Sequence, residues 1–253
     1  MLKENEEING LWIGNQLSPL ELLTLHSFTK HGHKFHLWIY EELQTNVPKG
    51  VILKDANKIL ERKYVFRYPA LSTKDKILKK YFNIKPKNGI DWGAGSYAGF
   101  SDLFRYKLLQ KYGGWWVDMD VTCLKSFNFP EPYFFRNHWK LKVVGNIMKV
   151  PPSSQLMKNC FELAKTAINE KNKNWHKPIE ILNKEIEQLD LMKYRRIGLF
   201  NLDLSHVIQL HYEKDYPIPN DWYGIHWINS SGAKKIKRGS TFSRLLNQFD
   251  VPH

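Results

Sequence analysis

One stretch of the chain decides its fold: Ser101-Asp-Leu-Phe-Arg-Tyr-Lys-Leu-Leu-Gln-Lys-Tyr-Gly-Gly-Trp-Trp-Val-Asp-Met-Asp120. Its apolar residues recur at helical spacing as far as Gly113 and Gly114, where the helix is expected to end. An apolar, aromatic strand is then expected over 115–121, interrupted only by Asp118 and Asp120. Because side chains alternate along a strand, both carboxylates are predicted to lie on one face.

Two neighbouring carboxylates repel each other unless a cation lies close to both. Mg²⁺ or Mn²⁺ suits such a pair, because these hard ions prefer oxygen ligands and keep coordination positions for a substrate phosphate. A D-x-D sequence alone is more often a solvated turn, and that alternative stays open on the pattern alone. The position after an apolar strand favours a ligand site, since open α/β sheets bind ligands at the carboxyl ends of their strands.

The composition indicates a single globular domain over residues 1–253. Hydrophobic residues make up 42% and aromatic residues 14% of the chain, which excludes a disordered or fibrous protein. Neither a transmembrane run nor an apolar signal-peptide centre is evident, so a cytoplasmic protein is expected. The two cysteines, Cys123 and Cys160, are expected in the core.

The chain is basic, with a formal net charge of +13. Such a charge favours anionic partners, which include nucleic acid, phosphorylated small molecules and an acidic membrane surface. A generally solvated basic surface explains the spread of lysines equally well. The local cluster at 234–238 is a candidate for contact with a leaving diphosphate or, peripherally, with an anionic membrane.

The pattern before this stretch predicts a βαβ unit with a parallel sheet. A short apolar strand is expected at 10–14, and a helix opened by Ser18, Pro19 and Glu21 is expected to reach Lys30. The other expected elements are strands at 35–40, 51–53 and 143–150, a loop at 89–99, a turn at 127–132, helices at 155–169 and 178–189, and an irregular C-terminal part.

Asp102 and Arg105 are three residues apart in the predicted helix and therefore share a face. An intrahelical salt bridge explains this spacing. The functional alternative is that Arg105 holds a phosphate with its planar fork of donors, while Asp102 accepts hydrogen bonds from sugar hydroxyls.

Three motifs together resemble the signature of glycosyltransferases with a DXD sugar-binding region: Ser101–Arg105, Tyr112–Gly114 and Trp116–Asp120. That group includes fungal initiating mannosyltransferases, bacterial capsular polysaccharide and lipopolysaccharide transferases, α-1,4-glycosyltransferases and, more distantly, clostridial glucosylating toxins. Further similar positions are Trp12–Gly14, Leu37-Trp38, and Asn146 followed by Pro151-Pro152.

The resemblance implies an α/β GT-A fold, with a Rossmann-like, mostly parallel central sheet flanked by helices. It also implies a retaining enzyme that uses Mn²⁺ or Mg²⁺ and a nucleotide-diphosphate sugar. The acceptor would be a glycan or glycolipid, as in surface polysaccharide biosynthesis. Residues 1–125 would mainly bind the donor, and residues 126–253 would mainly form the acceptor side.

The resemblance also implies roles for individual residues. Asp102, Arg105 and Asp120 would be catalytic, and the metal ligands would be Asp118, Asp120 and His226. The donor would be bound by Trp12, Ile13, Gly14, Asp102, Arg105, Trp116 and Asp118, with the base near Trp12, the sugar hydroxyls at Asp102, the diphosphate at Arg105 and the ribose at Asp118.

The C-terminal part matches the family less closely. His226 resembles a late histidine–tryptophan element, and a histidine packed in an aromatic cluster is the alternative. Gly198 stands where many members have a Gly-Pro turn at the acceptor, which makes Asn201 and Asp203 candidate acceptor contacts. The histidines at 31, 33 and 36 are expected on a surface turn.

Two other functions compete with this one. A sugar nucleotidyltransferase would carry a glycine-rich phosphate loop after its first strand, and the segment 12–18 is not such a loop. A nucleic-acid-binding module would explain the charge and the aromatic residues, but no binding motif is recognisable and no single element concentrates the basic residues. Nucleic acid is therefore not an expected partner.

Overall fold

The computed structural model describes residues 7–75, 77, 94–172, 174–229 and 236–252. The chain forms two compact units, each built from separate segments. Unit 1 comprises residues 1–56, 114–150 and 193–253, and unit 2 comprises residues 57–113 and 151–192. The expectation of one domain with a donor half and an acceptor half stays a prediction.

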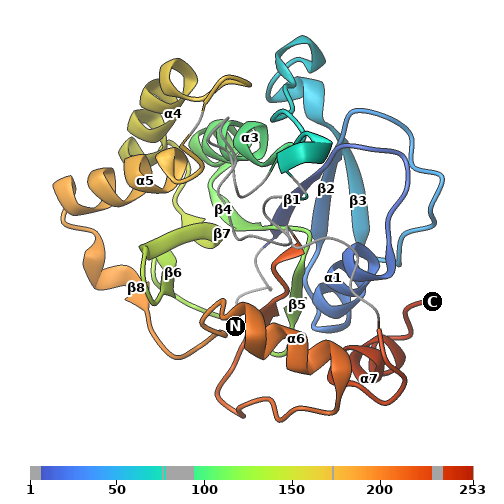
Figure 1. Cartoon of the computed structure of the whole chain (residues 1–253). Coiled ribbons are helices and arrows are strands. Elements are labelled where there is room, and N and C mark those ends of the chain that lie inside the picture. Colours follow the sequence, from blue (N-terminus) through green and yellow to red (C-terminus); the bar gives the residue numbers. More distant parts are fainter. Residues whose placement is uncertain (1–6, 76, 78–93, 173, 230–235, 253) are drawn as a thin grey trace. The chain divides into compact units, whose positions relative to one another are not determined.

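A seven-stranded sheet in the order β3-β2-β1-β4-β7-β6-β8 organises unit 1 (Figure 1). The pairs β1–β2, β2–β3, β1–β4 and β6–β8 are parallel, and the two pairs made by β7 are antiparallel. The expected α/β fold with a mostly parallel sheet is therefore confirmed. The strands are β1 (Ile8–Trp12), β2 (Phe35–Ile39), β3 (Val51–Asp55), β4 (Gly114–Val117), β6 (Phe134–His138), β7 (Lys142–Val150) and β8 (Arg195–Arg196).

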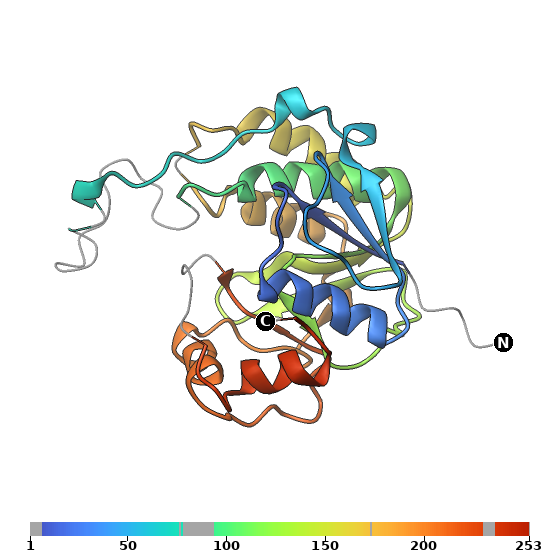
Figure 2. The same cartoon turned by 90° about the vertical axis from the view of Figure 1, so that its right-hand side faces the viewer.

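Unit 1 also contains a small antiparallel sheet of β5 (Val121–Cys123) and β9 (Gly224–His226). Its helices are α1 (Pro19–Lys30), α6 (Ser205–Glu213) and α7 (Thr241–Gln248). Figure 2 shows α1 beside the strands and α7 on its other side, in agreement with the packing of α1 against β2, β5 and α7. Ser18 and Glu21 form the expected capping box, in which the Ser18 amide donates to Glu21 Oε2 over 2.7 Å.

The strand order of unit 1 contains a topological switch point between β1 and β4. The chain runs outward from β1 to β2 and β3, and then returns to place β4 on the other side of β1. In open α/β sheets, ligands bind outside the carboxyl ends of the two strands at such a point. Here those two ends lead into the segments 12–14 and 118–120.

Unit 2 contains the helices α3 (Ala98–Tyr112), α4 (Gln155–Ala167) and α5 (Lys177–Gln188). α4 packs against both α3 and α5. The expected helix at 101–113 is therefore present and begins three residues earlier. Short 3₁₀ turns lie at Ala56–Lys58, Arg62–Tyr64 and Met192–Tyr194.

Gly113 ends α3 because no other residue fits its backbone. Its φ of 63° and ψ of −154° lie in a region that is essentially restricted to glycine. A Cβ atom at this position would also lie 2.3 Å from the backbone nitrogen of Pro152. The predicted glycine stop thus has both a conformational and a steric cause.

The predicted strand at 115–121 is wrong in its second half. β4 ends at Val117, and Asp118–Asp120 form a turn before β5 begins at Val121. The reason lies in α1, where the Thr24 hydroxyl donates to the Met119 carbonyl over 2.9 Å and accepts from the Val121 amide over 3.2 Å. The Thr24 side chain thus makes the backbone hydrogen bonds that a neighbouring strand would otherwise make. The positions of the two carboxylates are therefore set by a turn and not by the alternation of a strand.

Several other expectations need correction. The first strand is Ile8–Trp12 and not 10–14. The C-terminal part is not irregular, because it contains α6 and α7, the latter capped by Ser240. His33 is buried, and its Nε2 accepts a hydrogen bond from the Phe127 amide, so it is not a surface residue.

Both cysteines are buried, as predicted. The expected loop at 89–99 and the basic cluster at 234–238 lie partly outside the described residues. Within the described ranges, no helix combines the length and apolar character that a membrane span requires.

Candidate active site

Hydrogen bonds from two neighbouring strands hold the turn at Asp118. Trp116 Nε1 donates to Asp118 Oδ1 over 2.7 Å. The Asp118 amide donates to the carbonyl of Asn146, a residue of β7, over 2.9 Å. These contacts orient the first carboxylate of the D-x-D sequence at the carboxyl end of β4.

Asp120 is held by the C-terminal segment of unit 1. Its carbonyl accepts from the Trp227 amide, and its Oδ2 accepts from the Asn229 amide, each over 2.9 Å. The pairing of β5 with β9 places Val121 opposite His226. As a result, His226 Nε2 lies 3.4 Å from Asp120 Oδ2, although the two residues are far apart in sequence.

His226 lies between two carboxylates. Its Nδ1 is 2.8 Å from Asp203 Oδ1, on the side of the ring opposite Asp120. Burial alone would lower the pKa of His226, but the charges of Asp203 and Asp120 outweigh it and raise the pKa to about 10. The imidazole is therefore strongly coupled to both carboxylates and is not simply packed in an aromatic cluster.

Asp203 forms a bidentate ion pair with Arg136, a residue of β6. The two contacts measure 2.7 Å from Nη1 to Oδ2 and 2.6 Å from Nη2 to Oδ1. Burial would raise the pKa of Asp203, but His226 and Arg136 together hold it well below its usual range. A buried fork of this kind fixes the carboxylate geometrically as well as electrostatically.

Asn201 fixes the backbone of His226. Its Oδ1 accepts from the His226 amide over 2.8 Å, and its Nδ2 donates to the His226 carbonyl over 2.9 Å. Arg136 also donates to the Asn201 carbonyl and, over 3.3 Å, to Asn146 Oδ1. The hairpin of β6 and β7, the segment 201–203 and β9 thus meet in one largely buried polar network of unit 1.

The structure brings some of the predicted site residues together. Asp120 and His226 are in contact, and Asp118 lies in the same turn as Asp120. The parallel pairing of β1 with β4 places the segment Trp12–Gly14 after the strand adjacent to that turn. Trp12 Nε1 donates to the Gln16 carbonyl over 3.0 Å.

Asp102 and Arg105 form a separate pair in unit 2. Arg105 Nη1 lies 2.8 Å from Asp102 Oδ1 on the same face of α3, and both side chains are largely buried. The intrahelical ion pair expected from their spacing is present. Such a pair is also compatible with ligand binding, because its guanidinium has further donors.

Sequence reasoning missed Arg136 and the role of Asp203 next to His226. Arg136 follows Phe134 and Phe135 in a strand that was not predicted, and its side chain is fully buried. A charged residue inside an aromatic run was the available signal, because a buried arginine requires a charged partner. The identity of that partner was not readable, since Asp203 lies 67 positions away.

The residues present fit a divalent cation. A histidine that ligates a metal usually donates its other ring N–H to a carboxylate, and Asp203 is positioned to accept from His226 Nδ1. Nε2 then faces Asp120. Among the described residues, no group of three or more histidine, cysteine, aspartate or glutamate side chains is placed to hold a metal ion, so Asp120 and His226 offer two ligands only. Mg²⁺ sites that use one or two carboxylates and the phosphates of a substrate have this incomplete form.

Comparison with known proteins supports a glycosyltransferase. Residues 51–140 match a family model described as a glycosyltransferase sugar-binding region containing a DXD motif. The chain is also similar to a solved structure titled "PaToxG Glycosyltransferase", with 16% sequence identity and a TM-score of 0.49 over 73% of this chain and 70% of that chain. No curated protein matches the chain.

The matched region contains α3, the glycine stop and the turn with both aspartates, and it ends before Asp203 and His226. The family model favours a glycosyltransferase over the sugar nucleotidyltransferase and nucleic-acid-binding alternatives. The chain is thus a nucleotide-sugar-dependent glycosyltransferase, and its residues 51–140 are similar to the sugar-binding region of the family with a DXD motif.

Proposed function

We propose that this enzyme is a metal-dependent, retaining glycosyltransferase that transfers a sugar from a nucleotide diphosphate to a glycan or glycolipid acceptor. The observation that carries the metal dependence is the chain of contacts from Asp120 through His226 and Asp203 to Arg136. A largely buried histidine between two carboxylates, one of which is fixed by an arginine, is a suitable ligand with an oriented second nitrogen.

Asp120 and His226 would hold Mn²⁺ or Mg²⁺, with Asp118 contributing directly or through water. The bound metal would neutralise the charge that develops on the departing nucleotide diphosphate. Manganese accepts both carboxylate and imidazole ligands, whereas magnesium prefers oxygen. The mixed ligand set therefore supports manganese as the better cofactor.

The remaining roles follow from the resemblance of the 101–120 stretch to the family. Trp12, Ile13 and Gly14 would bind the nucleotide at the switch point of the sheet, with Trp116 and Asp118 on the neighbouring strand end. Asp102 would hold hydroxyls of the donor sugar and Arg105 the diphosphate, where a fixed positive charge stabilises the leaving group.

Retention of the anomeric configuration and a role in surface polysaccharide biosynthesis rest on the same resemblance. The proposed location is the cytoplasm, and the net charge of +13 supports a peripheral contact with an anionic membrane.

Thermal unfolding with a panel of nucleotide sugars tests this function. A donor that binds the folded state raises the melting temperature, and we expect the shift only when Mn²⁺ or Mg²⁺ is present. Asp120→Asn should keep the fold and abolish the metal-dependent shift, and the transfer rate should fall by about 10²–10³. Asp221→Asn, at an exposed aspartate, is the matched control and should behave like the wild type. The proposal fails if every donor, tested with metal, leaves the melting temperature unchanged.

A further inference from the structure

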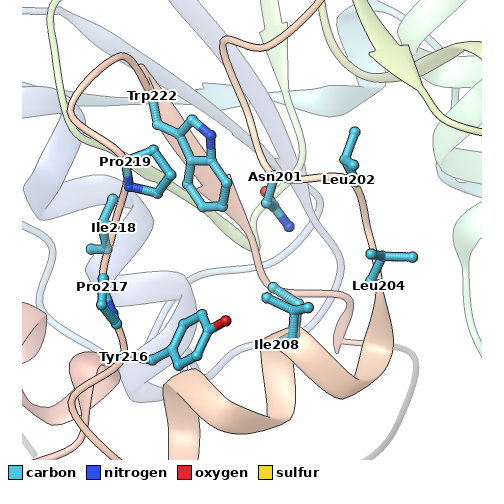
Figure 3. A pocket seen from close by; sticks show the side chains of 10 residues that line it. Asn201, Leu202, Leu204, Ile208, Tyr216, Pro217, Ile218, Pro219 and Trp222 are labelled. Carbon is cyan, nitrogen blue, oxygen red and sulfur yellow. The ribbon is translucent and has the colours of Figure 1, made fainter.

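A cavity in unit 1 adjoins the candidate active site. Its volume is about 500 Å³, within the range of about 300–1,000 Å³ that is typical of small-molecule sites. Its walls are formed by α6, by the turn around Pro217 and Pro219, and by Asn201, Leu202 and Leu204 (Figure 3).

The walls of this cavity are almost entirely apolar. Figure 3 shows Tyr216 and Trp222 on one side and Leu204 and Ile208 on the other. Among the described residues, no charged side chain lines the cavity. Apolar walls favour a hydrocarbon group, because transferring it from water into such surroundings is favourable by roughly 25 cal/mol for each Å² of apolar surface buried.

Asn201 connects the cavity to the candidate active site. It lines the cavity, and its amide also donates to Asp203 Oδ1 over 3.4 Å and to the His226 carbonyl. A molecule bound between Tyr216 and Ile208 is therefore separated by the Asn201 side chain from His226, the residue that contacts Asp120.

A cation lies beside the cavity wall. Lys214 Nζ is 5.7 Å from the centroid of the Tyr216 ring, and Lys214 itself is exposed. An amphiphile with a hydrocarbon tail and an anionic head group would match both the walls and this charge.

We propose that the cavity binds the hydrocarbon part of the acceptor, and that this acceptor is an amphiphile with an anionic head group such as a phosphate. The acceptor role of the bound molecule rests on the proposed function. The presence of a hydrocarbon-binding site depends only on the cavity. It makes the acceptor a glycolipid-type molecule and not a free glycan.

Calorimetry with octyl phosphate, below its micelle concentration, and with inorganic phosphate tests the hydrocarbon site. The wild type should bind octyl phosphate at least tenfold more tightly than inorganic phosphate. Val207→Glu places a charge in the cavity and should remove this preference. His206→Glu adds the same charge to an exposed position of the same helix and should retain it. Equal affinity for the two probes, or an unchanged preference in Val207→Glu, would overturn the site.

Further variants keep the test decisive. Val207→Phe narrows the cavity without adding a charge and should reduce the preference, even if Val207→Glu does not fold. Lys214→Gln should weaken the binding of octyl phosphate. An unchanged affinity would overturn the inference that the ligand has an anionic head group. Binding to anionic vesicles without binding to monomeric octyl phosphate would assign the effect to surface attraction and overturn the cavity site.

The nucleotide-sugar thermal shift, measured on the same proteins, separates this inference from the proposed function. Val207→Phe should bind octyl phosphate more weakly and keep the metal-dependent shift. A wild type that binds octyl phosphate but shows no shift with any nucleotide sugar would overturn the acceptor role and leave a hydrocarbon site.

Discussion

At the scale of single residues, the candidate active site depends on how one histidine is oriented. His226 Nδ1 contacts Asp203, and Asp203 is fixed by two hydrogen bonds from Arg136. Neither Asp203 nor Arg136 is assigned to the metal itself. In the proposed function both would be positioning residues, because their contacts favour the ring orientation in which His226 Nε2 faces Asp120.

This arrangement predicts the effect of Asp203→Asn. The amide is neutral and has one acceptor oxygen instead of two, so it holds His226 and Arg136 less firmly. Mn²⁺ affinity measured by calorimetry should therefore fall by about 10–100-fold. Glu213→Gln, at an exposed position outside the network, should leave the affinity unchanged. Unaltered Mn²⁺ binding in a folded Asp203→Asn protein would show that the Asp203 carboxylate does not orient a metal ligand.

At the scale of elements, the boundary between α3 and β4 depends on Gly113. Its backbone conformation is essentially restricted to glycine, and the Pro152 backbone leaves no room for a Cβ atom. Backbone strain alone would lower the free energy of unfolding of Gly113→Ala by ~1–3 kcal/mol. We expect a larger decrease, measured by urea unfolding, because the clash with Pro152 adds to the strain. Gly239→Ala is the control, since Gly239 also has a positive φ of 76°, but a Cβ atom added there would meet none of the described residues within 4 Å. Equal losses in the two variants would exclude the steric contribution at Gly113.

Helix α6 carries a second element-scale prediction at His211. Its side chain is buried, and neither ring nitrogen has a hydrogen-bond partner among the described residues. Burial lowers the pKa of His211, so the neutral imidazole packs against Tyr216 with ring centroids 5.1 Å apart. Because an unsatisfied buried polar group costs about 1–3 kcal/mol, His211→Phe should not lower the melting temperature. A drop of several degrees would indicate that the imidazole makes a favourable polar contact.

At the scale of the whole molecule, the charge of +13 predicts salt-dependent attraction to anionic surfaces. Co-sedimentation with vesicles that contain anionic lipid should be measurable at low salt and should disappear near 1 M salt, where the screening length is about 3 Å. Vesicles of neutral lipid are the control. Binding that persists at high salt would point to apolar insertion instead.

A polynucleotide that binds much more tightly than the vesicles, with a steep salt dependence, would favour the nucleic-acid alternative.

The sequence by itself determined the local elements and the chemistry of the DXD stretch. Helix α3, its glycine stop, the capping box of α1 and the parallel β1–β2 pair follow from spacing and caps, which act over a few residues. The 101–120 stretch also predicted the match to a glycosyltransferase sugar-binding region, because its motifs are contiguous. The strand β6 and the helices α6 and α7 were missed, although α7 carries a serine cap.

Only the tertiary structure decided how the site is assembled. The aspartate turn exists because Thr24 of α1 replaces a neighbouring strand, and the β5–β9 pairing brings His226 to Asp120. Arg136 and Asp203 meet because both charges are buried, and a buried charge must find a partner wherever the chain places one. Sequence spacing does not report such pairs, since the contacts join segments that are distant along the chain.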